Sequence, residues 1–292
     1  MRRLLVILAL WPAACGHRAI PTDGRATDTQ SDGGLLRDIS RGDSAWIDTP
    51  CGRARQGGDE SEVCVPAGTF VRGTDPGEGV WQASTPKRVI TLSAFFIDRY
   101  EVTRRRYLRC VAAGACAKTT MPVRPDNVPI GFARWPDALA FCAWDGRRLP
   151  TDAEWEKAAR GGCEMDGTPG CGPTDERPWP WGWDPPSCEL RNSSDDVKCG
   201  GGYAPVTAKP KGASPYHILA MGGNVEEWVS DYYGTTYYGT SPNVDPQGPL
   251  PSNRHILRGA FYFRALTAKH AVLVGSPGFV LGGIRCARSA TR

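Results

Sequence analysis

The stretch RLPTDAEWEKAARGG, residues 148–162, carries the clearest structural signal in the chain. Thr151 and Glu154 have the spacing of a capping box, in which each side chain accepts a hydrogen bond from the other residue's free backbone amide. Gly161-Gly162 follows and is typical of a helix end. One face of the intervening segment is apolar at helical spacing: Trp155, Ala158 and Ala159. The sequence therefore predicts a helix between Thr151 and Gly161 that buries this face.

Shorter elements precede this helix. VPAGTFVRG (65–73) alternates like a strand before a turn, and RVITLSAFFIDRYEVT (88–103) contains another strand. Thr103 is placed to cap a helix that runs to about residue 113. A further helix is expected over Trp135–Trp144. Short helices and strands in one chain indicate an α+β fold.

Composition limits the size and partners of the protein. A chain of 292 residues makes one large domain or two ordinary ones, and we expect one domain over residues 60–290. The 35 Gly and 25 Pro exceed the usual share and favour a loop-rich fold. The net charge is +4, with both signs mixed along the chain and no basic stripe, so a nucleic-acid partner is not expected.

The N-terminus has the features of an export signal. Met-Arg-Arg precedes the apolar run Leu4–Trp11 and then small residues, which predicts a signal peptide over residues 1–14. The run is too short to span a bilayer. Small residues before Cys15 also match a bacterial lipobox, which predicts a lipidated cell-envelope protein whose only membrane contact is the lipid; the alternative is free secretion. Residues 15–50 are polar and are expected to form a flexible linker.

Ten cysteines follow Cys15, and an even count in an exported chain predicts disulfides. Four short spacings suggest local bridges: Cys51–Cys64, Cys110–Cys116, Cys163–Cys171 and Cys188–Cys199. Cys142 and Cys286 remain and would join the middle of the domain to its end. Residues 163–215 show neither helical nor strand period, which is unusual within one domain, and the cysteines there would restrain these loops. Zinc is disfavoured because no C-x-x-C occurs.

Five stretches occur in a characteristic order: RLPTDAEWEKAARGG (148–162), PWG (180–182), GGNVEEWVSDYY (222–233), LRGAFY (257–262) and GIRCARS (283–289). Together they resemble the domain of formylglycine-generating enzymes, also called sulfatase-modifying factors, over about residues 64–289. The resemblance implies a C-type-lectin-like, disulfide-stapled α+β domain. It also supports the bridge Cys142–Cys286, because related proteins often carry cysteine at both positions.

Enzymes of that family oxidise a substrate cysteine with copper held by two cysteine thiolates. The resemblance places those ligands at Arg264 and Lys269, and Phe261 replaces a serine near the reacting centre. Cu(I) selects thiolates, and no cysteine lies between Cys199 and Cys286. The sequence therefore predicts that the protein has no copper and is not a formylglycine-generating oxidase.

The same region is the candidate ligand groove. The residues that would line it are Phe261, Arg264, Lys269 and His270, with Tyr232 and Tyr233 on a second wall and Tyr237 and Tyr238 nearby. Tyrosine clusters suit binding surfaces, although ordinary loop packing explains them equally well. We expect a non-catalytic binding module or pseudoenzyme with a peptide, protein or glycan ligand. The alternatives are an oxidoreductase or tailoring enzyme with non-copper chemistry in this groove, and a structural envelope protein.

Calcium is a second implication of the resemblance, because Gly222–Trp228 is similar to a family segment that holds this ion. Carried over, its ligands are the Gly223 and Val225 carbonyls and the Glu227 carboxylate, a set of oxygens that suits a hard cation. A second site would begin at Asn192 and Ser193. Both would be structural. The alternative for Glu227 is a buried ion pair with Arg258 or Arg285. Asn192-Ser193-Ser194 also matches a glycosylation acceptor, which matters only in a secreting eukaryote.

Overall fold

A computed structural model describes residues 45–75, 84–165, 170–172, 175–192, 199, 201–259, 273–275 and 281–290. The chain divides into two units, Met1–Arg41 and Gly42–Arg292, and all described residues belong to the second. The expected signal peptide, Cys15 and most of the expected linker lie outside the described residues. No helix within the described part is long and apolar enough to cross a membrane.

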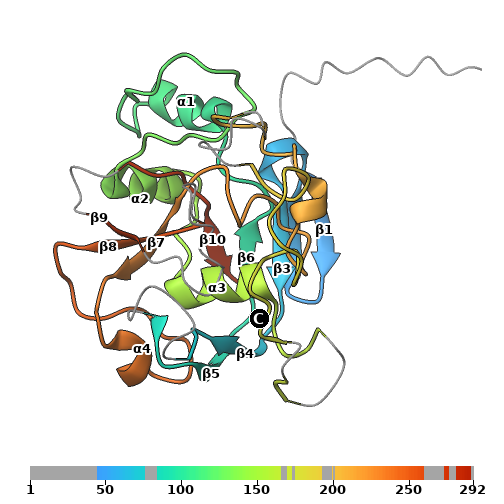
Figure 1. Ribbon diagram of the computed structural model, residues 1–292. Helices are drawn as coiled ribbons and strands as arrows, with labels where there is room; N and C mark the ends of the chain where they lie inside the picture. Colours follow the sequence, from blue (N-terminus) through green and yellow to red (C-terminus); the bar gives the residue numbers. More distant parts are fainter. Residues whose placement is uncertain are drawn as a thin grey trace, which may run out of the picture. The chain divides into compact units, whose positions relative to one another are not determined.

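Short strands and helices make up the Gly42–Arg292 unit (Figure 1). In chain order they are β1 (Ala45–Thr49), β2 (Gly52–Gln56), β3 (Glu62–Val65), β4 (Gly68–Arg72), β5 (Arg88–Leu92), β6 (Phe95–Asp98), α1 (Arg104–Ala112), α2 (Trp135–Trp144), α3 (Asp152–Arg160), β7 (Glu227–Tyr232), α4 (Tyr237–Thr240), β8 (His255–Arg258), β9 (Leu273–Gly275) and β10 (Ala287–Ser289). The sheets are β1–β2, β10–β6–β3, β4–β5 and β7–β8–β9, all paired antiparallel. This is the α+β class that the sequence predicts.

Helix α3 forms where the capping box predicts it. The Glu154 amide donates to Thr151 Oγ1 at 3.1 Å, and the Thr151 amide donates to Glu154 Oε2 at 2.8 Å. Its apolar face packs into a core with Phe70, Ile90 and Val229. The helix is more buried than the apolar face alone predicts, because all of Asp152–Arg160 is buried. Its charged side chains are therefore paired inside the protein, which places an ion cluster at the centre of the fold.

The other two long helices also match their predictions. The Thr103 side chain caps α1 by accepting a hydrogen bond from the Arg106 amide, and α2 covers Trp135–Trp144. Tyr107 of α1 and Phe141 of α2 stack in a second core that also contains Trp228. In Figure 1, α1 and α2 lie on one side of α3, and β4 and β5 lie on the other.

Five disulfides confirm the predicted bridges: Cys51–Cys64, Cys110–Cys116, Cys142–Cys286, Cys163–Cys171 and Cys188–Cys199. Cys142–Cys286 joins α2 to the residue before β10 across 144 positions of sequence. The described part of residues 163–215 contains no α-helix and no strand longer than an isolated bridge, as the missing periodicity predicts; Pro210–Gly212 forms a short 3-10 helix.

Two boundaries differ from the prediction. Strand β1 lies inside the segment 15–50 expected to be a linker, because it pairs with β2 in a hairpin next to the Cys51–Cys64 bridge. The ordered domain therefore begins before residue 50. The strand expected over 65–73 is β4, which begins at Gly68 and pairs with β5, whereas Val65 belongs to β3, which pairs with β6. Pro66 explains the break, because proline cannot donate a hydrogen bond to a neighbouring strand.

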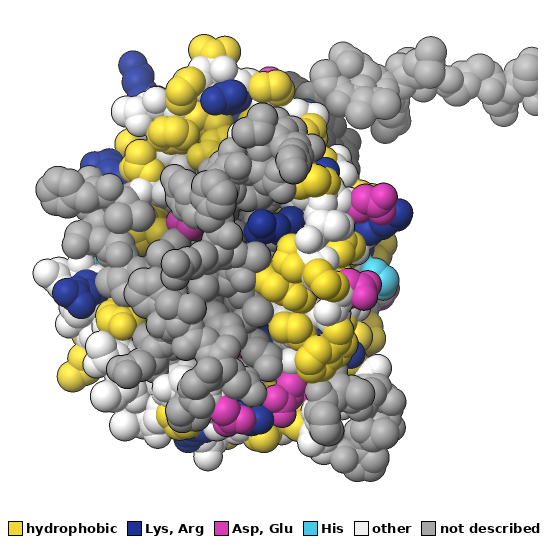
Figure 2. Space-filling view, in the orientation of Figure 1, with side chains coloured by type: hydrophobic (Ala, Val, Ile, Leu, Met, Phe, Trp, Pro, Cys, Tyr) yellow, Lys and Arg dark blue, Asp and Glu magenta, His cyan; other side chains and the backbone are white. Residues whose placement is uncertain are grey.

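Charged side chains are interspersed on the face shown in Figure 2. Basic and acidic groups lie in small separate clusters among apolar and neutral side chains. This agrees with the mixed charge pattern of the sequence.

Candidate functional site

A small cavity lies between the end of β7, helix α4 and strand β4. Its volume is about 10 Å³, which is the size of one water molecule or one small polar group. The residues that line it are Arg72, Tyr232, Tyr233, Gly234, Tyr237, Tyr238 and Ile256. Tyr232 and Tyr233, two of the predicted groove residues, both line this cavity, and so does Arg72, which the sequence analysis did not identify. We call this cavity the tyrosine pocket.

Arg72 is buried at the base of the tyrosine pocket, with 1% of its surface exposed. Its Nη2 donates to Asp152 Oδ2 at 2.6 Å, and its Nη1 donates to Ser241 Oγ at 3.4 Å. Among the described residues, none accepts a hydrogen bond from its buried Nε. The guanidinium carbon lies 3.9 Å from the ring centroid of Tyr238 and 5.7 Å from that of Tyr237, which are cation–π distances. Arg72 is therefore held by one carboxylate, one hydroxyl and two aromatic rings.

A buried ion cluster supports the pocket from below. Asp152 and Glu156 of α3 face Arg258, with Nε–Oδ1 and Nη2–Oε2 distances of 2.6 and 3.0 Å. Arg160 pairs with Glu156 at 2.9 Å, and the Tyr238 hydroxyl lies 2.9 Å from both carboxylates. Burial opposes ionisation of Asp152, but Arg258 and Arg72 hold its pKa well below its usual value. Asp152 is therefore a permanent anion that fixes both arginines.

Asp231 is a second buried carboxyl beside this cluster. Its Oδ2 accepts a hydrogen bond from the Asp152 amide at 2.8 Å, and its Oδ1 has no partner. Burial and the charge of Asp152 raise the pKa of Asp231 to about 7. Asp231 therefore changes its charge near neutral pH, whereas Asp152 does not.

An aromatic stack extends from Tyr232 away from the pocket. The His255 ring lies 3.7 Å from Trp135 and 4.6 Å from Tyr232, measured between centroids. His255 Nδ1 has no hydrogen-bond partner, and burial lowers the pKa of this histidine. The sequence analysis missed this residue as part of the site because its aromatic partners are distant in sequence.

The other predicted groove residues cannot be placed. Phe261, Arg264, Lys269 and His270 lie outside the described residues, as does Ser193 of the expected second calcium site. Their participation in a groove stays a prediction. Of the predicted groove residues, the structure describes only the tyrosines.

Glu227, the expected calcium ligand, is a buried ion-pair partner. Its carboxylate accepts hydrogen bonds from Arg285 Nη2 at 2.6 Å, from Arg285 Nε at 2.9 Å and from Trp155 Nε1 at 2.7 Å. Of the two arginines considered for this pairing, the structure has Arg285, while Arg258 is occupied by Asp152 and Glu156. Glu101 lies close by, and burial together with the charge of Glu227 raises its pKa well above its usual value.

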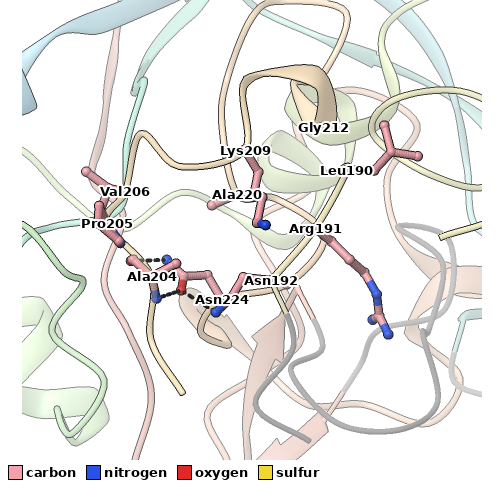
Figure 3. Close-up of a pocket in the computed structure, with 12 residues that line it drawn as sticks. Leu190, Arg191, Asn192, Ala204, Pro205, Val206, Lys209, Gly212, Ala220 and Asn224 are labelled. Atoms are coloured by element: carbon pink, nitrogen blue, oxygen red, sulfur yellow. Dashed lines mark hydrogen bonds between the residues drawn. The ribbon is translucent and has the colours of Figure 1, made fainter. Parts of the chain in front are cut away.

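The turn before Glu227 is held by Asn224, which adopts a left-handed conformation with φ 65°. Its Nδ2 donates to Glu101 Oε2 at 2.6 Å, and its Oδ1 accepts from Asn192 Nδ2 at 3.2 Å. Both asparagines line a second cavity of about 10 Å³ (Figure 3). In this view Lys209 points toward Ala220 and Asn192, and the Lys209 ammonium donates to the Cys188 carbonyl at 2.6 Å.

These contacts test the fit of calcium. The Glu227 carboxylate is already neutralised by Arg285, Ala220 offers no side-chain oxygen, and Lys209 brings a positive charge to the cavity that Asn192 lines. The described residues contain no group of three or more His, Cys, Asp or Glu side chains that could hold a metal. The Glu227 carboxylate is therefore engaged by Arg285 instead of being free for a cation, and calcium binding stays a prediction for experiment.

Thiol chemistry is limited by the disulfides. All ten cysteines from Cys51 to Cys286 are paired, so none of them carries a free thiolate. The segment in which the resemblance places the copper ligands contains no cysteine. A pair of thiolates for Cu(I) is thus missing from the whole stretch between the first and last of these cysteines.

Comparison with protein families agrees with this architecture. The model of the Sulfatase-modifying factor enzyme 1-like domain matches residues 49–290, and the chain belongs to this family. The formylglycine-generating enzyme of Streptomyces coelicolor is 30% identical over 273 residues, covering 72% of this chain and 81% of that protein. The bovine enzyme is 27% identical, covering 68% of this chain and 65% of its own length, so the chain spans just under two thirds of that relative.

Two further similarities bear on the site and the fold. A mouse protein named inactive Cα-formylglycine-generating enzyme 2 is 27% identical over 296 residues, covering 80% of this chain and 87% of that protein. The solved structure of PvdO from Pseudomonas aeruginosa has a TM-score of 0.64 at 21% identity, covering 84% of this chain and 98% of that chain. The structural similarity confirms the α+β fold.

Proposed function

We propose that this chain is an exported, non-catalytic binding protein of the family. It binds a peptide, protein or glycan in the groove where the family's enzymes would hold a cysteine-containing peptide. The tyrosine pocket forms one wall of this groove. Residues Phe261, Arg264, Lys269 and His270 are assigned to the other wall by the resemblance alone.

The main support for this proposal is that no free cysteine is left to bind copper between Cys51 and Cys286. Every cysteine from Cys51 to Cys286 is in a disulfide, and Arg264 and Lys269 stand where the resemblance puts the copper ligands. An arginine or lysine side chain cannot replace a thiolate on Cu(I). The framework is nevertheless complete, and a family fold retains binding surfaces when its chemistry is lost. The similarity to a mouse protein named as inactive supports the proposed loss of catalysis.

The disulfides also support export, because five bridges in one domain are typical of an oxidising compartment. We propose that Cys15 is lipidated after signal cleavage and anchors the domain to the bacterial envelope. Release of the protein from membranes by Cys15→Ser, measured by fractionation, tests the anchor. A variant that stays in the membrane fraction would contradict it.

The absence of catalysis is tested with Cu(I) and a cysteine-containing sulfatase peptide. We expect no stoichiometric copper binding and no formylglycine in the peptide by mass spectrometry. Copper binding at one ion per chain together with peptide conversion would overturn the proposal.

Binding is tested on peptide and glycan arrays. For a ligand found there, Arg264→Ala and Lys269→Ala should weaken binding about tenfold or more, the size expected for loss of a charge-assisted hydrogen bond, without lowering the melting temperature. Lys211→Ala is the control, because Lys211 pairs with Glu189 on an exposed surface. Unchanged affinity in both groove variants would exclude the groove, and chemical conversion of the ligand would identify an enzyme with other chemistry.

A further inference from the structure

We propose that residues 246–250 form a strap over the buried carboxyl of Asp231, and that this strap opens when the carboxyl ionises. The segment reads Pro-Gln-Gly-Pro-Leu and lies between α4 and β8. This device belongs to the fold and does not depend on the proposed binding function.

Backbone hydrogen bonds hold the chain on both sides of the strap. Before it, the Asp245 amide donates to the Thr91 carbonyl at 3.0 Å. After it, the Arg254 carbonyl accepts from the Tyr233 amide at 2.8 Å. Among the described residues, none makes a backbone–backbone hydrogen bond with residues 246–250 themselves. The strap is therefore free to move between two fixed ends without breaking a backbone ladder, which keeps the cost of opening low.

The middle of the strap covers Asp231. Gly248 has φ 88° and packs so closely that a β-carbon at this position would lie 3.0 Å from Asp231 Oδ1. Asp231 is 1% exposed, and no described residue gives its Oδ1 a hydrogen bond. The carboxyl is held through Oδ2, by the Asp152 amide at 2.8 Å and the Ser230 hydroxyl at 3.2 Å. Gly248 is itself partly exposed, so displacement of the strap brings water to Oδ1.

Ionisation of Asp231 is costly while the strap is closed. Burial and the carboxylate of Asp152 raise the pKa of Asp231 to about 7. The Tyr237 hydroxyl of α4 is also close, and burial together with the charge of Asp231 raises the pKa of this tyrosine. A buried carboxylate oxygen without a hydrogen-bond partner gains most from hydration, so the anion favours the open strap.

Two arginines on neighbouring segments offset part of this cost. Arg72 of β4 and Arg148, which precedes α3, both interact with the charge of Asp231. Their hydrogen bonds to carboxylates go elsewhere, from Arg72 to Asp152 at 2.6 Å and from Arg148 to Glu154 at 2.7 Å. The arginines therefore attract the anion without replacing the water that it loses in the closed state.

The two states of the strap consequently differ in their affinity for a proton. With the strap closed the pKa of Asp231 is about 7, and with the carboxyl in water it takes its ordinary value of 3.8. Opening becomes more favourable as the pH rises from about 4 to about 7, by at most about tenfold per pH unit. Above about pH 7 the carboxyl is ionised in both states, so the open population levels off.

Opening also loosens the tyrosine pocket. A β-carbon at Gly234 would lie 3.0 Å from Pro249 Cγ, and the Gly248 amide interacts with the Tyr237 hydroxyl. Gly234 and Tyr237 both line the pocket. The strap thus contacts one wall of the pocket, and its release near neutral pH frees that wall.

The open population is measured by ¹⁵N relaxation dispersion on the full mature protein without ligand, from about pH 5 to about pH 8 at constant ionic strength. The amides of Gln247, Gly248 and Leu250 report on the strap. The Trp155 amide, which donates to the Thr151 carbonyl inside α3, is the reference. We expect an open population at the strap amides that rises with pH, levels off near pH 7 and has no counterpart at Trp155.

Variants test the role of the carboxyl. Asp231→Asn keeps the shape of the side chain but cannot ionise, so its open population should be the same at every pH. Asp126→Asn is the matched control, because Asp126 is 61% exposed and pairs with Arg104 at the start of α1, and it should keep the wild-type pH dependence. Gly248→Ala should raise the open population at every pH, because its β-carbon meets Asp231.

The wild-type protein provides a second measurement if Asp231→Asn does not fold. The ¹³Cγ resonance of Asp231 follows its ionisation, and its midpoint should coincide with the pH at which the open population levels off. A midpoint more than about one pH unit away would overturn the strap. So would the absence of an open population, one that does not change with pH, or wild-type pH dependence in Asp231→Asn. A pH-dependent strap in a protein that binds no array ligand would retain the device and reject the proposed function.

Discussion

Glu227→Gln distinguishes a buried ion pair from a calcium ligand. The substitution keeps an oxygen for Trp155 Nε1 but removes the charge that faces Arg285, which is fully buried. Breaking a buried ion pair by removing one partner costs about 3–5 kcal/mol. Glu101 offsets part of this cost, because it also faces Arg285 and the charge of Glu227 is one cause of its raised pKa. With Glu227 neutral, Glu101 ionises more easily and compensates Arg285, so we expect a loss of about 3 kcal/mol.

The loss is measured by urea unfolding of the mature protein in EDTA and again in millimolar Ca²⁺. An ion-pair role gives the same loss in both buffers, because the stabilising partner belongs to the protein. Glu189→Gln, at an exposed pair with Lys211, should leave the free energy of unfolding almost unchanged, because exposed ion pairs contribute little, and it serves as the control. A loss that appears only with Ca²⁺, together with a wild-type melting temperature that falls in EDTA, would refute this reasoning and establish Glu227 as a calcium ligand.

Three further outcomes are expected. The pKa of Asp231 is about 7 in the folded protein, against an ordinary 3.8, so its contribution to stability is complete below about pH 4 and is lost as the pH rises to 7. The free energy of unfolding should fall by at most about 1.4 kcal/mol per pH unit for this reason. Asp231→Asn should reduce this fall in urea unfolding measured from pH 4 to 8. Replacing Cys142–Cys286 by alanines should cost about 5 kcal/mol by loop closure over 144 residues, against about 2 kcal/mol for Cys110–Cys116 over 6, and equal losses would contradict the loop-length argument. Thiol titration of unfolded, unreduced mature protein should find no free thiol, and two or more per chain would reopen metal binding.

The helices were predictable because their signals are local. A capping threonine accepts a hydrogen bond from a backbone amide three positions later. Thr103 and Thr151 therefore predict the starts of α1 and α3 without knowledge of the fold. The short disulfides were predictable for the same reason. The strand boundaries were harder to predict. The alternating pattern runs through Pro66, although the residues before it belong to β3, which pairs with β6, and those after it belong to β4, which pairs with β5.

The site was only half predictable because its partners are distant in sequence. Tyrosines 232 and 233 attract attention as a cluster, but Arg72 appears in the sequence as an ordinary charged residue at a strand end. Its burial depends on Asp152, 80 positions away, and on Tyr238, farther still. No spacing rule connects such residues, so a buried arginine held by distant partners is visible only after the chain has folded.

The ion cluster joins elements of the fold that are distant in sequence. Arg72 belongs to β4, Asp152 and Glu156 to α3, Tyr238 to α4 and Arg258 to β8, so one network fixes four elements around the pocket. None of these residues lies in the segment where the resemblance places the copper ligands. The network is therefore built from residues outside that segment of the sequence. If the proposed function is correct, a binding surface supported by this network does not require cysteines at positions 264 and 269.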